Sequence, residues 1–114
     1  MPLINCIKAD ITELKKRDVE AILQMAEQKN GPIEMVVCCA ATSKPAMFLS
    51  SDLDQFKHHM DLNFIGVLKF ILPIAKRMSL RRTLGRICLV GDPIASQHAI
   101  PGISPYACSK AALE

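Results

Sequence analysis

The chain has 114 residues, a length suited to one small domain; 50% of them are hydrophobic and 22% are charged. This composition is typical of a globular protein and excludes a disordered chain. The formal net charge of +3 is too small to indicate a nucleic-acid partner. The five cysteines form no C-x-x-C pair and have no histidine at zinc-like spacing. We therefore expect reduced thiols, no metal site and an intracellular protein.

The first third of the chain predicts a strand, a helix and a second strand. Residues 3–9 have the apolar character of a strand, and Asp10 or Thr12 can cap the helix that follows. Apolar side chains then recur at helical spacing as far as position 29, and Gly31 suits a left-handed helix end. Residues 33–41 form a continuous apolar run, which is typical of a strand buried on both faces.

A long helical pattern occupies the middle of the chain. Apolar residues step by three or four from Leu53 to Met78, with a break expected near Asp61 and a bend at Pro73. The segment 60–78 carries two apolar stripes, so we expect one side against a sheet and the other against a partner subunit. Its apolar stretch, 64–75, is interrupted by Lys69 and Pro73 and is too short to span a bilayer.

The last third predicts a strand at residues 87–90, a loop, and a helix from Tyr106 to Glu114. The order strand, helix, strand, helix, strand, helix indicates an α/β fold with a parallel sheet and right-handed crossovers. In such sheets the working residues follow the carboxyl ends of the strands.

A basic cluster before the last predicted strand allows two interpretations. It can face phosphate or an anionic membrane surface, or it can be a solvated helix end, where cations are favoured. Its members are Lys76, Arg77, Arg81, Arg82 and Arg86.

Tyr106 and Lys110 lie four residues apart and therefore share one face of the last predicted helix. A free tyrosine, with a pKa near ~10, is a poor acid or base at neutral pH. A nearby ammonium lowers that pKa, and the pair can then exchange a proton with a carbonyl oxygen while a cofactor moves hydride.

This pair stands among blocks that, in this order, resemble the short-chain dehydrogenase/reductase family over essentially the whole chain. The blocks are Ala9 to Thr12, Glu34 to Ala41, Met60 to Gly66, Gly85 to Ile87 and Tyr106 to Glu114. The resemblance implies a partial doubly wound parallel (Rossmann-like) sheet with three strands. It also implies that residues 1–114 are an incomplete domain, without the first β-α-β unit and the C-terminal part.

The resemblance also implies roles for individual residues. Tyr106 matches the catalytic acid or base, Lys110 the lysine that assists it and holds the nicotinamide ribose, and Asn63 the asparagine that supports a relay water. Asp10 and Ile11 match the pair that flanks the adenine ring. Cys38 to Ala41 stand where the family keeps Asn-Asn-Ala-Gly, so that Cys39, Ala40 and Ala41 would lie beside the cofactor, and the segment 60–78 matches the helix used for homo-oligomers.

Within the family, four blocks are most similar to those of 3-ketodihydrosphingosine reductases, NADPH-dependent enzymes of sphingolipid synthesis. They are Gly31 to Val37, Met60 to Asn63, Gly85 to Ile87 and Tyr106 to Glu114. This likeness implies NADP(H) as cofactor, a small ketone or lipid substrate, and a place at the cytoplasmic face of the endoplasmic reticulum.

Two departures from the family pattern weaken the expectation of catalysis by this chain. Asp92 occupies the usual position of the catalytic serine, where a carboxylate repels a developing oxyanion unless it is protonated; Ser96 lies four residues further on. The five glycines, at positions 31, 66, 85, 91 and 102, do not form the T-G-x-x-x-G-x-G turn that cradles the cofactor phosphates. We therefore expect the isolated chain to be inactive.

Two further hypotheses remain beside the oxidoreductase. One is a non-catalytic relative that dimerises with other proteins of the family, which both departures favour. The other is a flavodoxin-like nucleotide-binding or signalling domain, for which only Asp10 and Asp92 supply acidic residues at strand ends.

Overall fold

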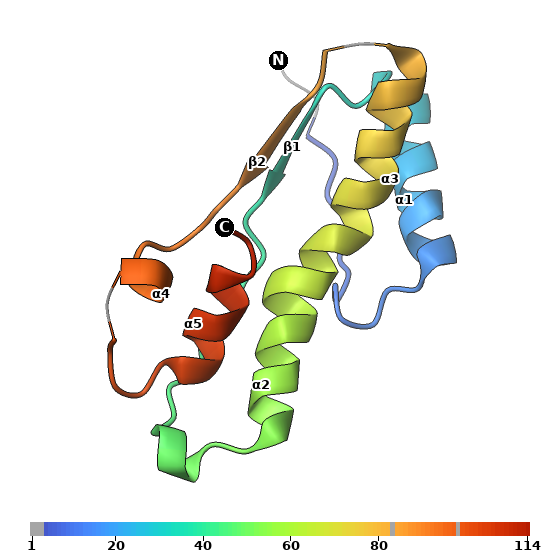
Figure 1. Cartoon of the computed structure of the whole chain (residues 1–114). Coiled ribbons are helices and arrows are strands. Elements are labelled where there is room, and N and C mark those ends of the chain that lie inside the picture. The colour runs from blue at the N-terminus through green and yellow to red at the C-terminus, as the bar shows by residue number, and fades with distance from the viewer. Residues whose placement is uncertain (1–3, 83, 98) are drawn as a thin grey trace.

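The computed structural model describes residues 4–82, 84–97 and 99–114, and its alternating helices and strands confirm the predicted α/β class (Figure 1). The elements are α1 (Lys16–Asn30), β1 (Met35–Cys38), the 3-10 helix η1 (Phe48–Ser50), α2 (Leu53–Met60), the π-helical turn η2 (Asp61–Ile65), α3 (Gly66–Arg81), β2 (Arg86–Leu89), α4 (Ile94–Gln97) and α5 (Ser104–Ala111).

The sheet consists of β1 and β2, which pair in parallel with Met35 opposite Arg86 and Cys38 opposite Leu89. The long helix connects them, as a parallel pair requires. In Figure 1, α1 and α3 lie together to one side of the strands, and α5 lies beside α2. The carboxyl ends of both strands point toward α5, so the segments after β1 and β2 lie near it.

The strand that the sequence predicts at residues 3–9 is not formed. Leu3 lies outside the described residues, and residues 4–9 pair with neither described strand. A strand is held by ladder hydrogen bonds to a neighbour, and β2 is the strand that pairs with β1. The expectation of three strands is therefore wrong for the described part of the chain.

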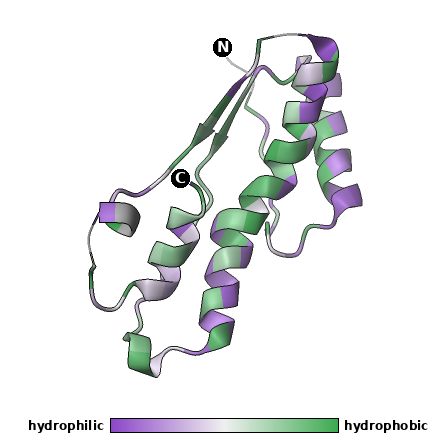
Figure 2. Ribbon diagram, in the orientation of Figure 1, coloured by the Kyte–Doolittle hydropathy of each residue, from purple (hydrophilic) through white to green (hydrophobic). Residues whose placement is uncertain are grey.

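The expected burial of both sheet faces is also wrong. Met35 and Val37 of β1 are 54% and 52% exposed, and all four residues of β2 are exposed. Only the other face of β1 is covered, because Val36 packs against the core between α1 and α3. Figure 2 shows hydrophobic residues along both strands and the middle of the long helix, whereas α1 is largely hydrophilic.

The core lies between α1 and α3, and it consists of Val19, Leu23, Ile74 and Met78. Each helix presents the apolar face that its spacing predicts. α1 begins later than predicted, at Lys16, because Asp10 accepts hydrogen bonds from Thr12 in a turn of its own. It ends as predicted at Gly31, whose φ of +83° favours glycine; ψ is −175°, so the residue is not in the left-handed helical region.

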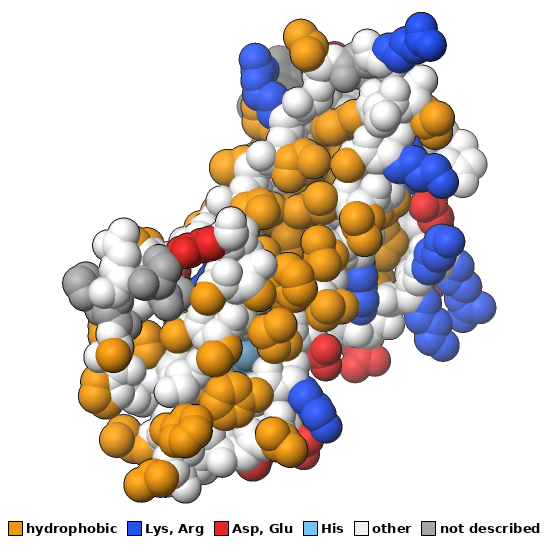
Figure 3. Space-filling model, in the orientation of Figure 1, with side chains coloured by type: hydrophobic (Ala, Val, Ile, Leu, Met, Phe, Trp, Pro, Cys, Tyr) orange, Lys and Arg blue, Asp and Glu red, His pale blue; other side chains and the backbone are white. Residues whose placement is uncertain are grey.

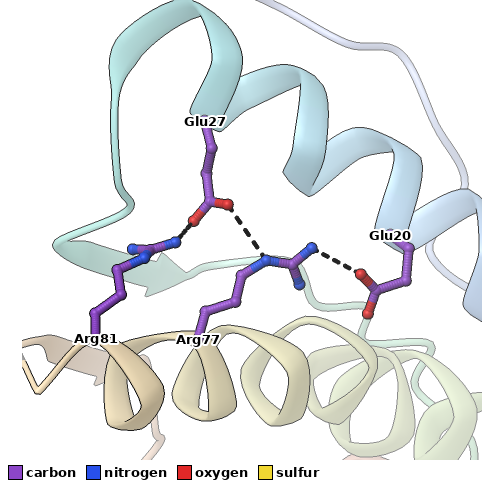
Figure 4. A network of polar contacts seen from close by, with 4 residues as sticks. All are labelled: Glu20, Glu27, Arg77 and Arg81. Carbon is purple, nitrogen blue, oxygen red and sulfur yellow. Dashed lines mark hydrogen bonds and ion pairs between the residues drawn. The ribbon is translucent and has the colours of Figure 1, made fainter.

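Charged residues join the same two helices along the rim of the core (Figure 4). Arg77 contacts Glu20 at 2.7 Å and Glu27 at 3.3 Å, and Arg81 also pairs with Glu27. Arg77 and Arg81 thus form ion pairs with glutamates of α1. This finding argues against phosphate or membrane contact by these two members of the basic cluster.

The long helix continues from Leu53 to Arg81 without the break expected near Asp61. Five residues, Asp61–Ile65, instead form a π-helical turn. Such turns are often found at functional sites, and this one carries Asn63. In the described residues no helix is both long and apolar enough to cross a membrane.

Candidate active site

Tyr106 and Lys110 lie one turn apart on α5, as their spacing predicts. The Lys110 ammonium is 6.0 Å from the centroid of the Tyr106 ring. The lysine is only 4% exposed, and its Nζ donates a hydrogen bond of 2.8 Å to the carbonyl oxygen of Val90, just beyond β2. The lysine therefore ties α5 to the end of the second strand.

Asp92 follows β2 and faces the same tyrosine. Its Oδ2 accepts a hydrogen bond of 2.6 Å from the Tyr106 hydroxyl, and its Oδ1 accepts one of 3.0 Å from the Ile94 amide. The residue at the serine position therefore contacts the catalytic candidate directly, through a carboxylate and not a hydroxyl. α4 includes Ser96, and it begins two residues after Asp92.

This contact reverses the electrostatics that the sequence predicts. The hydrogen bond to the Asp92 carboxylate, together with burial, raises the pKa of Tyr106 to about 12. The expectation that Lys110 lowers the pKa is wrong here, because the carboxylate is in direct contact while the ammonium bonds to Val90. The pKa of Asp92 is lowered, chiefly by the Tyr106 hydroxyl, so a protonated Asp92 that donates to an oxyanion is disfavoured.

Asn63 is completely buried in the π-helical turn and bonds to two distant segments. Its Oδ1 accepts a hydrogen bond of 2.7 Å from the Thr42 amide, and its Nδ2 donates to the Thr42 carbonyl and the Ser109 hydroxyl, each at 2.9 Å. Both side-chain N–H groups are thus used within the protein. Asn63 holds together the helix, the segment after β1, and α5.

The sequence motifs did not point to two buried residues, Ser109 and His59, that hold segments around the site together. Ser109 on α5 accepts from Asn63 and donates to the Tyr106 carbonyl at 2.7 Å. His59 lies one turn before Asn63, and its Nε2 accepts from the Lys44 amide at 3.1 Å while Nδ1 bonds to the Gln55 carbonyl at 2.7 Å. His59 and Asn63 are four residues apart and therefore lie on one helix face. This spacing is the signal that could have revealed that His59, like Asn63, binds the segment after β1.

A separate hollow of about 620 Å³ collects four of the predicted cofactor-binding residues. Its lining includes Asp10 and Ile11 from the segment before α1 and Ala40 and Ala41 from the end of β1. Cys39 is adjacent in the chain but does not line it, and neither do Tyr106 and Lys110. Residues 30 positions apart in the sequence thus meet at one site, as strand-end residues of a parallel sheet should.

The segment containing Asp10 and Ile11 is anchored to α3. The Lys69 ammonium donates to the carbonyl oxygens of Ile11 at 2.8 Å and Thr12 at 3.0 Å. Gly66 permits the close approach, because an added Cβ would lie 3.0 Å from Ile11 Cγ2. Hydrogen bonds from Thr12 hold the pKa of Asp10 below its usual value and so favour its ionised carboxylate.

The hollow at Asp10, Ile11, Ala40 and Ala41 is separate from the Tyr106–Lys110 pair, and we expect the first to border the adenine end of a nicotinamide dinucleotide and the second its reactive end. The 114 residues contain no glycine-rich turn for the phosphates. In the ranges 4–82, 84–97 and 99–114, no group of three or more His, Cys, Asp or Glu is placed to hold a metal ion.

The parallel strands with their crossover helices are a fold of the Rossmann type. A family profile described as short chain dehydrogenase matches residues 2–114, and the chain belongs to this family. A 3-dehydrosphinganine reductase of Danio rerio is 33% identical over 97% of this chain, and a 3-ketodihydrosphingosine reductase of Mus musculus is 31% identical over the same share. The chain spans 32% of the length of each of these relatives.

Solved structures agree with the assignment. A gluconate 5-dehydrogenase of Burkholderia cenocepacia, in complex with NADP and tartrate, superposes with a TM-score of 0.79 at 27% identity. The match covers 92% of this chain and 40% of that one. The apo form of LigO from Sphingobium reaches a TM-score of 0.85 at 24% identity, over 94% of this chain and 38% of that one, and supports the fold alone. The NADP-bound structure supports a nicotinamide cofactor for the family.

Proposed function

We propose that the protein takes part in the reduction of a ketone by NADPH, with Tyr106 as the proton donor. The observation that carries the proposal is the placement of Tyr106 and Lys110 on α5, tied through Ser109 to the buried Asn63. The NADP-bound structural relative supports this choice of cofactor. The chain spans only 32% of the length of its reductase relatives. We therefore propose the activity for a complete domain of this family that contains these residues, and not for the isolated chain.

Most of the predicted residues have a task in this mechanism. Asp10, Ile11, Ala40 and Ala41 would border the adenine end of the cofactor, with Cys39 beside them. Lys110 would hold the ribose next to the nicotinamide, which supplies hydride when bound. Tyr106 would give its proton to the carbonyl oxygen. Asn63 keeps α5 and the segment after β1 in register, and we propose that it also supports the relay water.

The substrate class we propose is a long-chain 3-keto sphingoid base. Two relatives that are 33% and 31% identical carry reductase names of this class. Such a lipid resides in membranes, so we also propose that the protein acts at the cytoplasmic face of the endoplasmic reticulum. Exposed apolar side chains at η1, Phe48 at 66% and Leu49 at 96%, would suit contact with a lipid surface.

The activity is tested by grafting this chain in place of the matching third of the Danio rerio reductase. NADPH absorbance is followed with a long-chain 3-keto substrate. We expect Tyr106→Phe and Lys110→Met to reduce turnover by roughly 10²-fold or more. Lys57→Met is the matched control, because the Lys57 side chain is 71% exposed on α2. Unchanged turnover in Tyr106→Phe would remove the proposed role of the tyrosine.

The isolated chain is expected to be inactive, because it has no cradle for the cofactor phosphates. We expect no saturable NADPH binding when the 114-residue chain is titrated in a calorimeter. A binding isotherm in that experiment would contradict this part of the proposal.

A second candidate function is a non-catalytic partner that dimerises with relatives. It is favoured by the Asp92 carboxylate on the Tyr106 hydroxyl, which opposes proton donation. A groove of about 780 Å³ between α1 and α3 offers a surface for such pairing, with Leu68, Leu72 and Pro73 in its lining. Capture of the Danio rerio reductase by this chain, with a matching complex size, would favour this function over catalysis.

A further inference from the structure

The contact between Asp92 and Tyr106 is fixed from both sides. One carboxylate oxygen accepts from the Tyr106 hydroxyl at 2.6 Å, and the other accepts from the Ile94 amide at 3.0 Å. The hydrogen bond from the Ile94 amide holds the Asp92 carboxylate at the start of α4. The other oxygen of the carboxylate, Oδ2, then faces Tyr106 on α5. The hydrogen of the phenol is therefore directed at Asp92.

No described cation balances this anion at the phenol oxygen. The Lys110 ammonium is hydrogen-bonded to Val90, and it acts on Asp92 from a distance. α5 itself also carries Cys108. The other titratable side chains on elements packed against α5 are Asp54, Lys57, His58 and His59 of α2 and Asp61 of η2. The titratable group that raises the pKa of Tyr106 is Asp92, and not one of the side chains on these elements.

We propose that Asp92 is a positioning residue that holds Tyr106 as a protonated donor to its own carboxylate and so withholds the phenol from ketone reduction. This inference rests on the proposed function and concerns the regulation of the same site. It assigns to Asp92 an inhibitory role that is opposite to that of a hydroxyl at the same position.

The reason lies in the charges that the reaction creates. In the proposed reduction, the carbonyl oxygen would take the proton of Tyr106, and the tyrosine O–H bond would break, as the carbonyl carbon received the hydride that a bound nicotinamide supplies. A phenolate would then face the Asp92 carboxylate at hydrogen-bond distance with no proton between them. Two adjacent anions are costly in a partly desolvated site, whereas a serine would donate a hydrogen bond to the reacting oxygen.

The raised pKa of Tyr106 sets the ionisation that an experiment should find. A tyrosine whose pKa rises from 10.0 to about 12 has an approximately 100-fold smaller phenolate fraction at any pH below both values. Replacing Asp92 by serine or asparagine removes the negative charge. Asparagine keeps an acceptor oxygen of the same reach, and serine does not.

The protein offers a clean test, because Tyr106 is its one tyrosine and it has no tryptophan. Tyrosinate absorbance at pH ~10 therefore reports this residue alone. We expect about 1% ionisation in the wild-type chain, several-fold or more above that in Asp92→Ser with about half as the upper limit, and an intermediate value in Asp92→Asn, because burial of the ring persists in both variants. Asp54→Ser is the control, because the Asp54 side chain is 93% exposed on α2. Circular dichroism at the same pH verifies the fold of each variant.

Two outcomes would overturn the inference. One is equal ionisation of Tyr106 in the wild type and Asp92→Ser; the other is a wild-type value equal to that of the chain unfolded in urea. In the grafted reductase, Asp92→Ser is expected to raise NADPH turnover, and unchanged turnover in an otherwise active graft also contradicts the inhibitory role. If no graft turns over but the ionisation difference is found, the proposed function fails while the Asp92 contact stands.

Discussion

Asn63 makes the largest set of buried hydrogen bonds around the candidate site, so its removal is a sharp test at the residue scale. Asn63→Ala would leave the Thr42 amide without its acceptor and the Ser109 hydroxyl without its donor. We expect the free energy of unfolding to fall by about 1–3 kcal/mol, measured by urea denaturation. Asn30→Ala removes an exposed asparagine bond to Ala26 and should cost much less. Similar losses in both variants would contradict the network.

Motif spacing predicted which residues gather at the site but not what they contact. Tyr106 and Lys110 share a helix face because their separation is four. The sequence did not reveal that the phenol bonds to Asp92, since that depends on how the segment after β2 lies against α5. For the same reason Ser109 was missed: its importance follows from the helix that packs on it, which no local pattern records.

At the element scale, the ion pairs between α1 and α3 predict a pH dependence (Figure 4). Arg77 lowers the pKa of Glu20 below its usual 4.5. A carboxylate whose pKa is lower in the folded state adds stability above its unfolded pKa, and the gain disappears as pH falls through the folded pKa. Glu20→Gln should therefore lower the urea midpoint at pH 7 and have little effect below the folded pKa.

The control for this prediction is Asp54→Asn. Asp54 pairs with Lys57 at 4.0 Å, and both side chains are largely exposed, so the pair should contribute little at any pH. A Glu20→Gln effect of constant size from pH 7 to pH 3 would show that charge is not the cause.

Helices were easier to predict than strands in this chain, for a physical reason. A helix forms its hydrogen bonds within itself, so the apolar spacing of α1 and α3 was enough to locate them. A strand needs a neighbour. In the described residues β1 pairs with β2, and no described strand lies beside residues 4–9. Residues 4–9 thus have no partner within reach in the described chain.

At the scale of the whole molecule, the sequence predicted the α/β class and the family but overestimated burial. Apolar runs such as 33–41 predict how a strand is buried in a complete sheet. This chain spans 32% of its sphingoid reductase relatives, and half or more of the surface of Met35 and Val37 is exposed. Figure 3 shows the consequence, a broad band of hydrophobic side chains across the face in view.

The groove between α1 and α3 also exposes apolar side chains, and we expect it to drive self-association through the segment 60–78. Leu72 lines the groove and is 63% exposed. Leu72→Lys would place an ammonium in the contact and should weaken association roughly tenfold or more, as measured by light scattering across a dilution series. Leu84→Lys is the matched control, because Leu84 is fully exposed and lies outside the groove. If both variants associate like the wild type, the groove is not the contact; if both dissociate equally, general charge and not the groove is responsible.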